Sequence, residues 1–147
     1  MSNDLGMALG VQHLEIAAGH SAPASAIPTP PLFHFTCDHC APSIVGCGAL
    51  LPNRQPFFPY LAPLVWLTSL PDPERDAVGL TSSTYIACDR MAHRFRVLDT
   101  STCLPWLSAI AIAPSYVVPA DPLELLHSYG KPDTWWISTV AVPVVLG

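Results

Sequence analysis

The chain has 147 residues, of which half are hydrophobic and 12% are charged, and its formal net charge is −5. This balance excludes a mainly disordered chain, which needs low hydrophobicity and high net charge, and a protein that coats nucleic acid, which needs an excess of clustered positive charge. The length is typical of one domain, and 17 prolines favour short strands and turns over long helices. We therefore expect one small, sheet-rich α+β domain with short helices.

Residues 1–31 are predicted to precede the folded domain. Apolar spacing from Met7 to Ala18 indicates one short helix, and the segment Ser21–Pro31 is rich in Ser, Ala and Pro, as in an extended arm. The single α+β domain is then predicted to span residues 32–147.

The N-terminus lacks the basic cluster and continuous apolar segment of a signal peptide. The uncharged stretch Leu104–Ala120 is too short for a bilayer span and contains three prolines. We therefore expect a soluble, cytoplasmic protein with no membrane partner. In a reducing compartment, its odd number of cysteines is predicted to remain as thiols: Cys37, Cys40, Cys47, Cys88 and Cys103.

The first predicted elements of the domain are a strand and a short helix. Leu32–Thr36 has the composition of a strand, and Asp38 is predicted to cap a helix that runs to about Cys47. Gly46 or Gly48 would end this helix. The apolar run Leu64–Leu70 is predicted to be a buried strand.

The second half of the domain is predicted to contain further strands and one helix. His93–Leu98 alternates between apolar and charged residues, which is typical of a half-buried strand. The helix is predicted at Asp121–Tyr129, with Asp121 as cap and Pro122 at its first position. The remaining predicted strands are Thr84–Ala87, Trp106–Ala113, Tyr116–Val118 and Trp135–Val145, the last with a possible break at Pro143.

Three arginines, Arg90, Arg94 and Arg96, form the one basic group of the sequence. Two interpretations stay open. They are solvated positions on a half-buried strand, or they contact a phosphate or diphosphate, whose oxygens suit the planar guanidinium fork.

The segment Leu32–Asn53 reads LFHFTCDHCAPSIVGCGALLPN. It resembles the opening strand and helix of ADP-ribosyltransferase-like folds, most closely those of the DNA-modifying ADP-ribosyltransferase toxins and more distantly those of the RNA 2′-phosphotransferases. In that family a strand carrying His-x-Thr precedes a short helix and then Gly-x-Leu, where the chain re-enters the sheet. The matching positions here are His34, Thr36, Ile44, Gly48 and Leu50.

The resemblance implies a protein that cleaves or binds NAD, with His34 holding a ribose hydroxyl and Thr36 on the same strand face. An aromatic ring would stack on the nicotinamide, and the candidates are Trp66, Tyr85 and Trp135. A late glutamate would stabilise an oxocarbenium-like state, and Glu124 is the only glutamate in the second half of the chain. His34 and Glu124 are thus the implied catalytic residues. NAD is the implied substrate, no metal is expected, and nucleic acid enters only as a possible acceptor.

Two positions depart from the family pattern. Cys40 stands where the toxins carry an asparagine, and Glu124 falls in a predicted helix, whereas the family glutamate usually lies at a strand. A core histidine satisfied by a backbone group is therefore the alternative role of His34.

Other function classes also stay open. His13 and Glu15 followed by Cys37 and Cys40 imitate the signature of a zinc-dependent deaminase. A structural zinc site would use Cys37, Cys40 and Cys47 with a histidine. A non-enzymatic assembly or interaction protein, of the viral or phage structural type, would use the proline-rich arm and a flat apolar patch instead of a ligand site.

Overall fold

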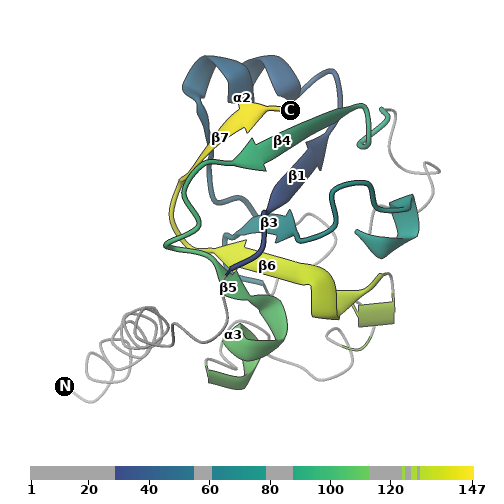
Figure 1. Ribbon diagram of the computed structural model, residues 1–147, viewed down its shortest axis with the longest axis vertical. Helices are drawn as coiled ribbons and strands as arrows, with labels where there is room; N and C mark the ends of the chain where they lie inside the picture. Colours follow the sequence, from purple (N-terminus) through teal and green to yellow (C-terminus); the bar gives the residue numbers. More distant parts are fainter. Residues whose placement is uncertain (1–28, 55–60, 79–87, 113–123, 125–126, 129) are drawn as a thin grey trace.

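The computed structural model describes residues 29–54, 61–78, 88–112, 124, 127–128 and 130–147. Within these residues, strands form one sheet in the order β2-β7-β4-β1-β3-β6-β5, and all neighbours are antiparallel (Figure 1). The strands are β1 (Phe33–Thr36), β2 (Ala49–Leu50), β3 (Val65–Thr68), β4 (His93–Val97), β5 (Leu104–Pro105), β6 (Trp135–Ser138) and β7 (Val142–Leu146). The helical elements are α2 (Ala41–Cys47), η1 (Arg75–Ala77), α3 (Trp106–Ile112) and η4 (Pro132–Thr134).

The described residues thus form a small sheet-rich domain with short helices. None of the helices in this part of the chain has the length and apolar character needed to cross a membrane.

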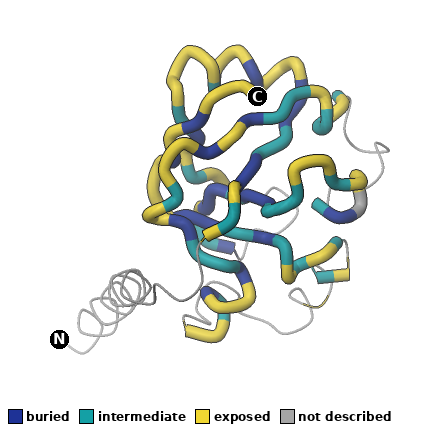
Figure 2. Tube along the Cα trace, viewed as in Figure 1, coloured by how far each residue is buried: buried dark blue, intermediate teal, exposed yellow. Residues whose placement is uncertain are grey.

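Two hydrophobic clusters cover opposite faces of the sheet, and buried residues follow the strands in Figure 2. Successive residues of a strand point to opposite faces. On β3, Leu67 belongs to the first cluster, whereas the adjacent Trp66 packs on the second. Helix α2 covers the first cluster through Ala41 and Ile44. Helix α3 contributes Trp106 and Ala109 to the second, which we call the tryptophan cluster because Trp66, Trp106 and Trp135 meet there.

The predicted order of a strand followed by a short helix is confirmed by β1 and α2. The prediction that Asp38 caps this helix is wrong. Cys40 is the N-cap residue and makes no side-chain cap bond. The carboxylate of Asp38 instead contacts Nε2 of His93 at 2.5 Å. Pro42 is accommodated in the first turn, where no intrahelical N–H bond is lost, and Gly48 ends the helix with φ 71°.

Two predictions in the second half of the domain are also wrong. The run after Pro105 was predicted as a strand but forms the helix α3. Residues three positions apart lie on one side of a helix, and Trp106 and Ala109 accordingly both face the tryptophan cluster. The final strand is two strands, β6 and β7, with the break at residues 139–141 and not at Pro143, which pairs with Ala49 inside β7.

The strands predicted at Leu64–Leu70 and His93–Leu98 are confirmed as β3 and β4, each with slightly shorter bounds. Several other predictions lie outside the described residues: the helix Met7–Ala18, the strands Thr84–Ala87 and Tyr116–Val118, and most of the helix Asp121–Tyr129.

Candidate functional site

His34 lies on β1, the central strand of the sheet, between β3 and β4. All four residues of β1 pair with β4, but only Phe33 pairs with β3, opposite Thr68. The Nδ1 atom of His34 lies 2.9 Å from the main-chain oxygen of Trp66 on β3. The imidazole therefore links β1 to β3 beyond the single backbone pair.

This contact fixes the chemical form of the His34 ring. A carbonyl oxygen can only accept, so Nδ1 carries the hydrogen and Nε2 is left with the lone pair. Burial lowers the pKa of His34, and this effect outweighs the Trp66 hydrogen bond, which raises the pKa. The ring is neutral at pH 7, with Nε2 as a hydrogen-bond acceptor.

Arg90 acts on His34 through its positive charge, which lowers the pKa of His34 further. Arg90 is partly buried, and its neighbour Asp89 is bound by Arg75 at 2.6 Å. Of the three arginines in the basic group, Arg90 is the one that the structure connects with His34.

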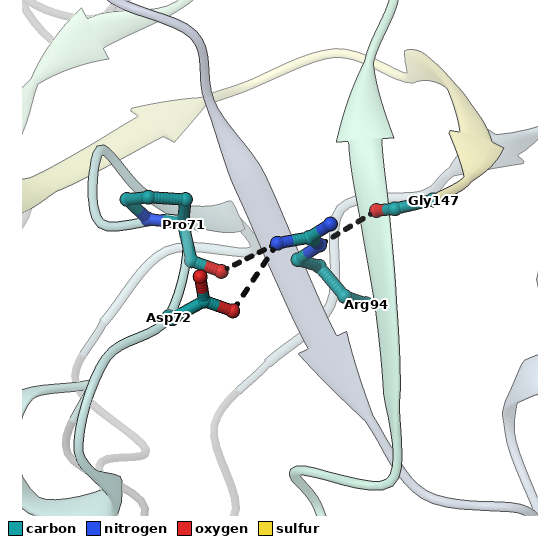
Figure 3. Close-up of polar contacts among 4 residues, drawn as sticks. All are labelled: Pro71, Asp72, Arg94 and Gly147. Atoms are coloured by element: carbon teal, nitrogen blue, oxygen red, sulfur yellow. Dashed lines mark hydrogen bonds and ion pairs between the residues drawn. The ribbon is translucent and has the colours of Figure 1, made fainter.

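Arg94, from the same basic group, has a structural role (Figure 3). Its Nε donates to the oxygen of Gly147 at 2.8 Å, and its Nη1 donates to the oxygen of Pro71 at 2.9 Å and to Asp72 at 3.3 Å. The guanidinium also lies 5.3 Å from the centre of the Phe33 ring. Arg94 therefore ties β7 and the loop after β3 to β4.

Thr36 is buried and shares a strand face with His34, as the spacing of two predicts. It lies opposite His93, whose ring contacts Asp38. His34 and Thr36 are thus brought together on one strand beside β3.

The indole rings of Trp66 and Trp135, unlike the side chain of Thr36, do not share a sheet face with His34. Both indoles pack in the tryptophan cluster, with ring centres 6.0 Å apart, on the face opposite the one that strand alternation gives His34. Trp135 is buried, and its Nε1 donates to the oxygen of Ala77 at 2.9 Å. Trp66 Nε1 is buried without a hydrogen-bond partner.

The two other predicted site residues are Tyr85 and Glu124. Tyr85 lies outside the described residues. Glu124 is exposed, and His127, three positions later, packs against Trp106 and Trp135 of the tryptophan cluster. No contact between Glu124 and His34 is present in the described part of the chain.

Within the described residues, no group of three or more His, Cys, Asp or Glu side chains is placed to hold a metal ion. His13 and Glu15, which the deaminase alternative requires, lie outside these residues.

No protein-family model, curated protein or solved structure matches this chain. The candidate site is therefore defined by its own geometry. The sequence singled out His34 and Thr36 through the resemblance of this segment to a His-x-Thr strand, but it did not separate Arg90 from Arg94 and Arg96. The effect of the Arg90 charge on the pKa of His34 depends on how the segment before β4 packs, and no local pattern in the sequence records that packing.

Proposed function

We propose that the chain is an ADP-ribosyltransferase-like protein that binds NAD around His34. The observation that carries this proposal is the neutral His34 ring, held on the central strand with Nε2 as acceptor. The positive charge of Arg90 also acts on this ring. NAD offers a matching pair of groups. A ribose hydroxyl donates to Nε2, and the diphosphate receives the guanidinium of Arg90.

The fixed tautomer is what makes His34 suitable for this role. The Trp66 carbonyl holds Nδ1, so the ring neither rotates nor needs to lose a proton before it accepts from a hydroxyl. Thr36 lies on the same face of β1 and is buried. In this proposal His34 orients the ribose and Arg90 neutralises the phosphates.

Cleavage of the nicotinamide–ribose bond makes a further demand. It requires a carboxylate near the sugar to stabilise developing positive charge, and we assign this role to Glu124. Tyr85, five positions before Arg90, is the aromatic candidate for the nicotinamide ring. Trp66 and Trp135 serve the tryptophan cluster.

The test separates the two nitrogens of His34. His34→Asn places an amide N–H near the position of Nδ1 and can keep the bond to the Trp66 carbonyl, but it has no equivalent of Nε2. His34→Ala removes both. We expect His34→Asn to unfold near the wild-type temperature and to bind NAD about 5- to 150-fold more weakly, which corresponds to the loss of about 1–3 kcal/mol. His34→Ala should lose both stability and NAD binding.

The measurements are thermal unfolding with and without NAD, and release of free nicotinamide. Glu124→Gln should abolish any nicotinamide release while the NAD-induced shift in unfolding temperature remains. If NAD leaves the unfolding temperature of the wild-type protein unchanged and only His34→Ala alters stability, His34 is a structural histidine and the proposal fails.

One observation favours the assembly alternative. Large apolar side chains are exposed on α2 and β7 and next to β2 and β4, among them Val45, Leu146, Leu51 and Leu98. Such side chains bury surface when copies of a chain associate. A molecular mass that rises with concentration in light scattering, together with no response to NAD, would favour assembly over NAD binding.

A further inference from the structure

The half of the sheet that contains β7 and β4 is packed on one face only. Val97 on β4 and Val144 on β7 are paired, and both belong to the first hydrophobic cluster, on the face that α2 covers. The next residues along each strand point to the opposite face. Helix α3 lies at the other end of the sheet, beside β6 (Figure 1). The opposite face of β7 and β4 therefore lies outside both hydrophobic clusters.

The side chains on this second face are mainly apolar and exposed. The ladder pairs Arg96 with Val145, and it continues past the end of β4, where the Leu98 N–H donates to the Pro143 oxygen at 2.9 Å. Pro143 is exposed, and the exposed fractions of Leu98 and Val145 are 58% and 40%. Because these four residues share one face of two paired strands, we call them the open face.

Arg96 is the charged residue of the open face, and its charge restricts what can bind there. It is exposed, and no ion pair joins it to a carboxylate of the described residues, whereas Arg94 is bound to Asp72. A partner that covered the open face would take this cation out of water, which is costly unless the partner supplies a carboxylate. The chain itself carries one nearby, because Asp99 directly follows Leu98 and is exposed.

A second copy of the chain meets this requirement. In a pair of copies with two-fold symmetry, the same surface is used by both, and every contact is made twice. An axis through Leu98 stacks the two Leu98 side chains and sets β4 of one copy antiparallel to β4 of the other. Arg96, two positions before the axis, then faces the turn after β4 of the other copy, where Asp99 lies. The open face is thus complementary in charge to itself.

We propose that the open face is a dimer interface in which Arg96 of each copy binds Asp99 of the other, around a centre formed by Leu98, Pro143 and Val145. The inference does not depend on NAD binding. It also differs from the assembly alternative, because a two-fold pair closes at two copies, whereas an open assembly continues to grow.

The first test is the molecular mass of the full chain, measured by sedimentation equilibrium from about 1 µM to about 1 mM, the range of weak association. The mass should rise from 15.8 kDa to twice that value and then stay constant. Leu98→Asp should weaken dimerisation by more than about 100-fold, because both copies bring this residue into the interface. Leu107→Asp is the matched control, since Leu107 is an exposed leucine on α3, and it should leave the dimer intact.

Charge reversal tests the pairing of Arg96 with Asp99. Arg96→Asp and Asp99→Arg should each weaken dimerisation by about 10- to 100-fold, because each places like charges together on both sides of the axis. The double variant should restore the dimer, since both signs are exchanged in both copies. Asp99→Arg also loses the bond that the Ser101 N–H donates to the carboxylate. A folding defect from that loss would not be corrected by the second substitution, so restoration reports on the interface.

A wild-type mass of 15.8 kDa at every concentration overturns the proposal, since the open face would then bind another protein or another part of the same chain. A mass that grows beyond two copies overturns it in favour of open assembly. A dimer that survives Leu98→Asp, or a double variant that associates no better than the single variants, would mean that the copies meet through another face and would equally overturn it.

Discussion

Burial lowers the pKa values of His34 and His127. The two rings use opposite nitrogens: His34 holds a carbonyl through Nδ1, whereas His127 accepts from the indole N–H of Trp106 through Nε2 at 2.8 Å. Protonation of His127 turns Nε2 into a donor and removes the acceptor that Trp106 requires.

This arrangement predicts acid-sensitive stability. Both histidines titrate at a lower pH in the folded chain than their ordinary value of 6.5. The unfolded chain therefore binds more protons between the two values, and the free energy of unfolding should fall as the pH drops below about 6.5. Above that pH the stabilisation is complete. Denaturant unfolding across pH 5–8 measures the slope.

His127→Gln is the matched variant, because the amide oxygen can accept from Trp106 but does not titrate in this range. The loss of stability on acidification should be shallower in His127→Gln than in the wild-type protein. An identical slope in both proteins would show that His127 makes no contribution.

Arg94 and Arg96 give a second comparison at the scale of single residues. They point to the same face of β4, but Arg94 binds the Pro71 and Gly147 carbonyls, while Arg96 is exposed. Arg94→Lys keeps the charge and loses the planar fork. We expect it to lower the free energy of unfolding by about 1 kcal/mol, because the hydrogen bonds are partly exposed to water.

Arg96→Lys is the control and should change the free energy by no more than about 0.5 kcal/mol. Both values come from chemical denaturation at one pH. Equal effects of the two substitutions would contradict the structural role assigned to Arg94.

At the scale of elements, the two glycines of α2 and its cap predict opposite effects. Gly48 ends the helix with φ 71°, a conformation that costs an L-residue about 1–2 kcal/mol. Gly46 lies inside the helix, and an added Cβ there meets nothing within 4 Å. Gly48→Ala should therefore destabilise the protein, whereas Gly46→Ala should stabilise it by about 0.5–1 kcal/mol.

Thermal unfolding of the two variants, each with a single added methyl group, makes this comparison direct. A Gly48→Ala protein as stable as the wild type would contradict the role assigned to Gly48, since glycine would then not be required at the left-handed cap.

Elements with a clear period were predictable from the sequence. β4 alternates charged and apolar residues, and the two-residue spacing on β1 put His34 and Thr36 on one face. The secondary structure of the run beginning at Trp106 was not predictable, because a short apolar segment fits a buried strand and a buried helix equally well. Asp38 has the composition of a helix cap, yet a tertiary contact with His93 determines its position.

The candidate site was predictable to the same extent. A continuous apolar strand does not show which residues face which side, so the sequence of β3 did not reveal that Trp66 packs away from His34. The effect of the Arg90 charge on the pKa of His34 arises between segments more than 50 positions apart, and residue spacing contains no information about it.

At the scale of the whole molecule, the sheet is built from distant pairings. β1 is the first of the described strands and lies at the centre, where it pairs with β3 and with the still later β4. The last strand, β7, lies between β4 and β2. Pairings of this kind must pay the entropy of closing long loops before they gain contacts, so slow folding is expected.

The position of β7 also matters while the chain is being made. The ribosome adds β2 and β4 well before β7, and Val142 follows Val97 by 45 positions. At about 5–20 residues per second, this interval lasts about 2–9 seconds. Throughout it, β4 and β2 lack the strand that joins them, and unpaired edges can pair with other nascent chains. Newly made chains of this protein should therefore depend on chaperones most strongly just before the final strand emerges.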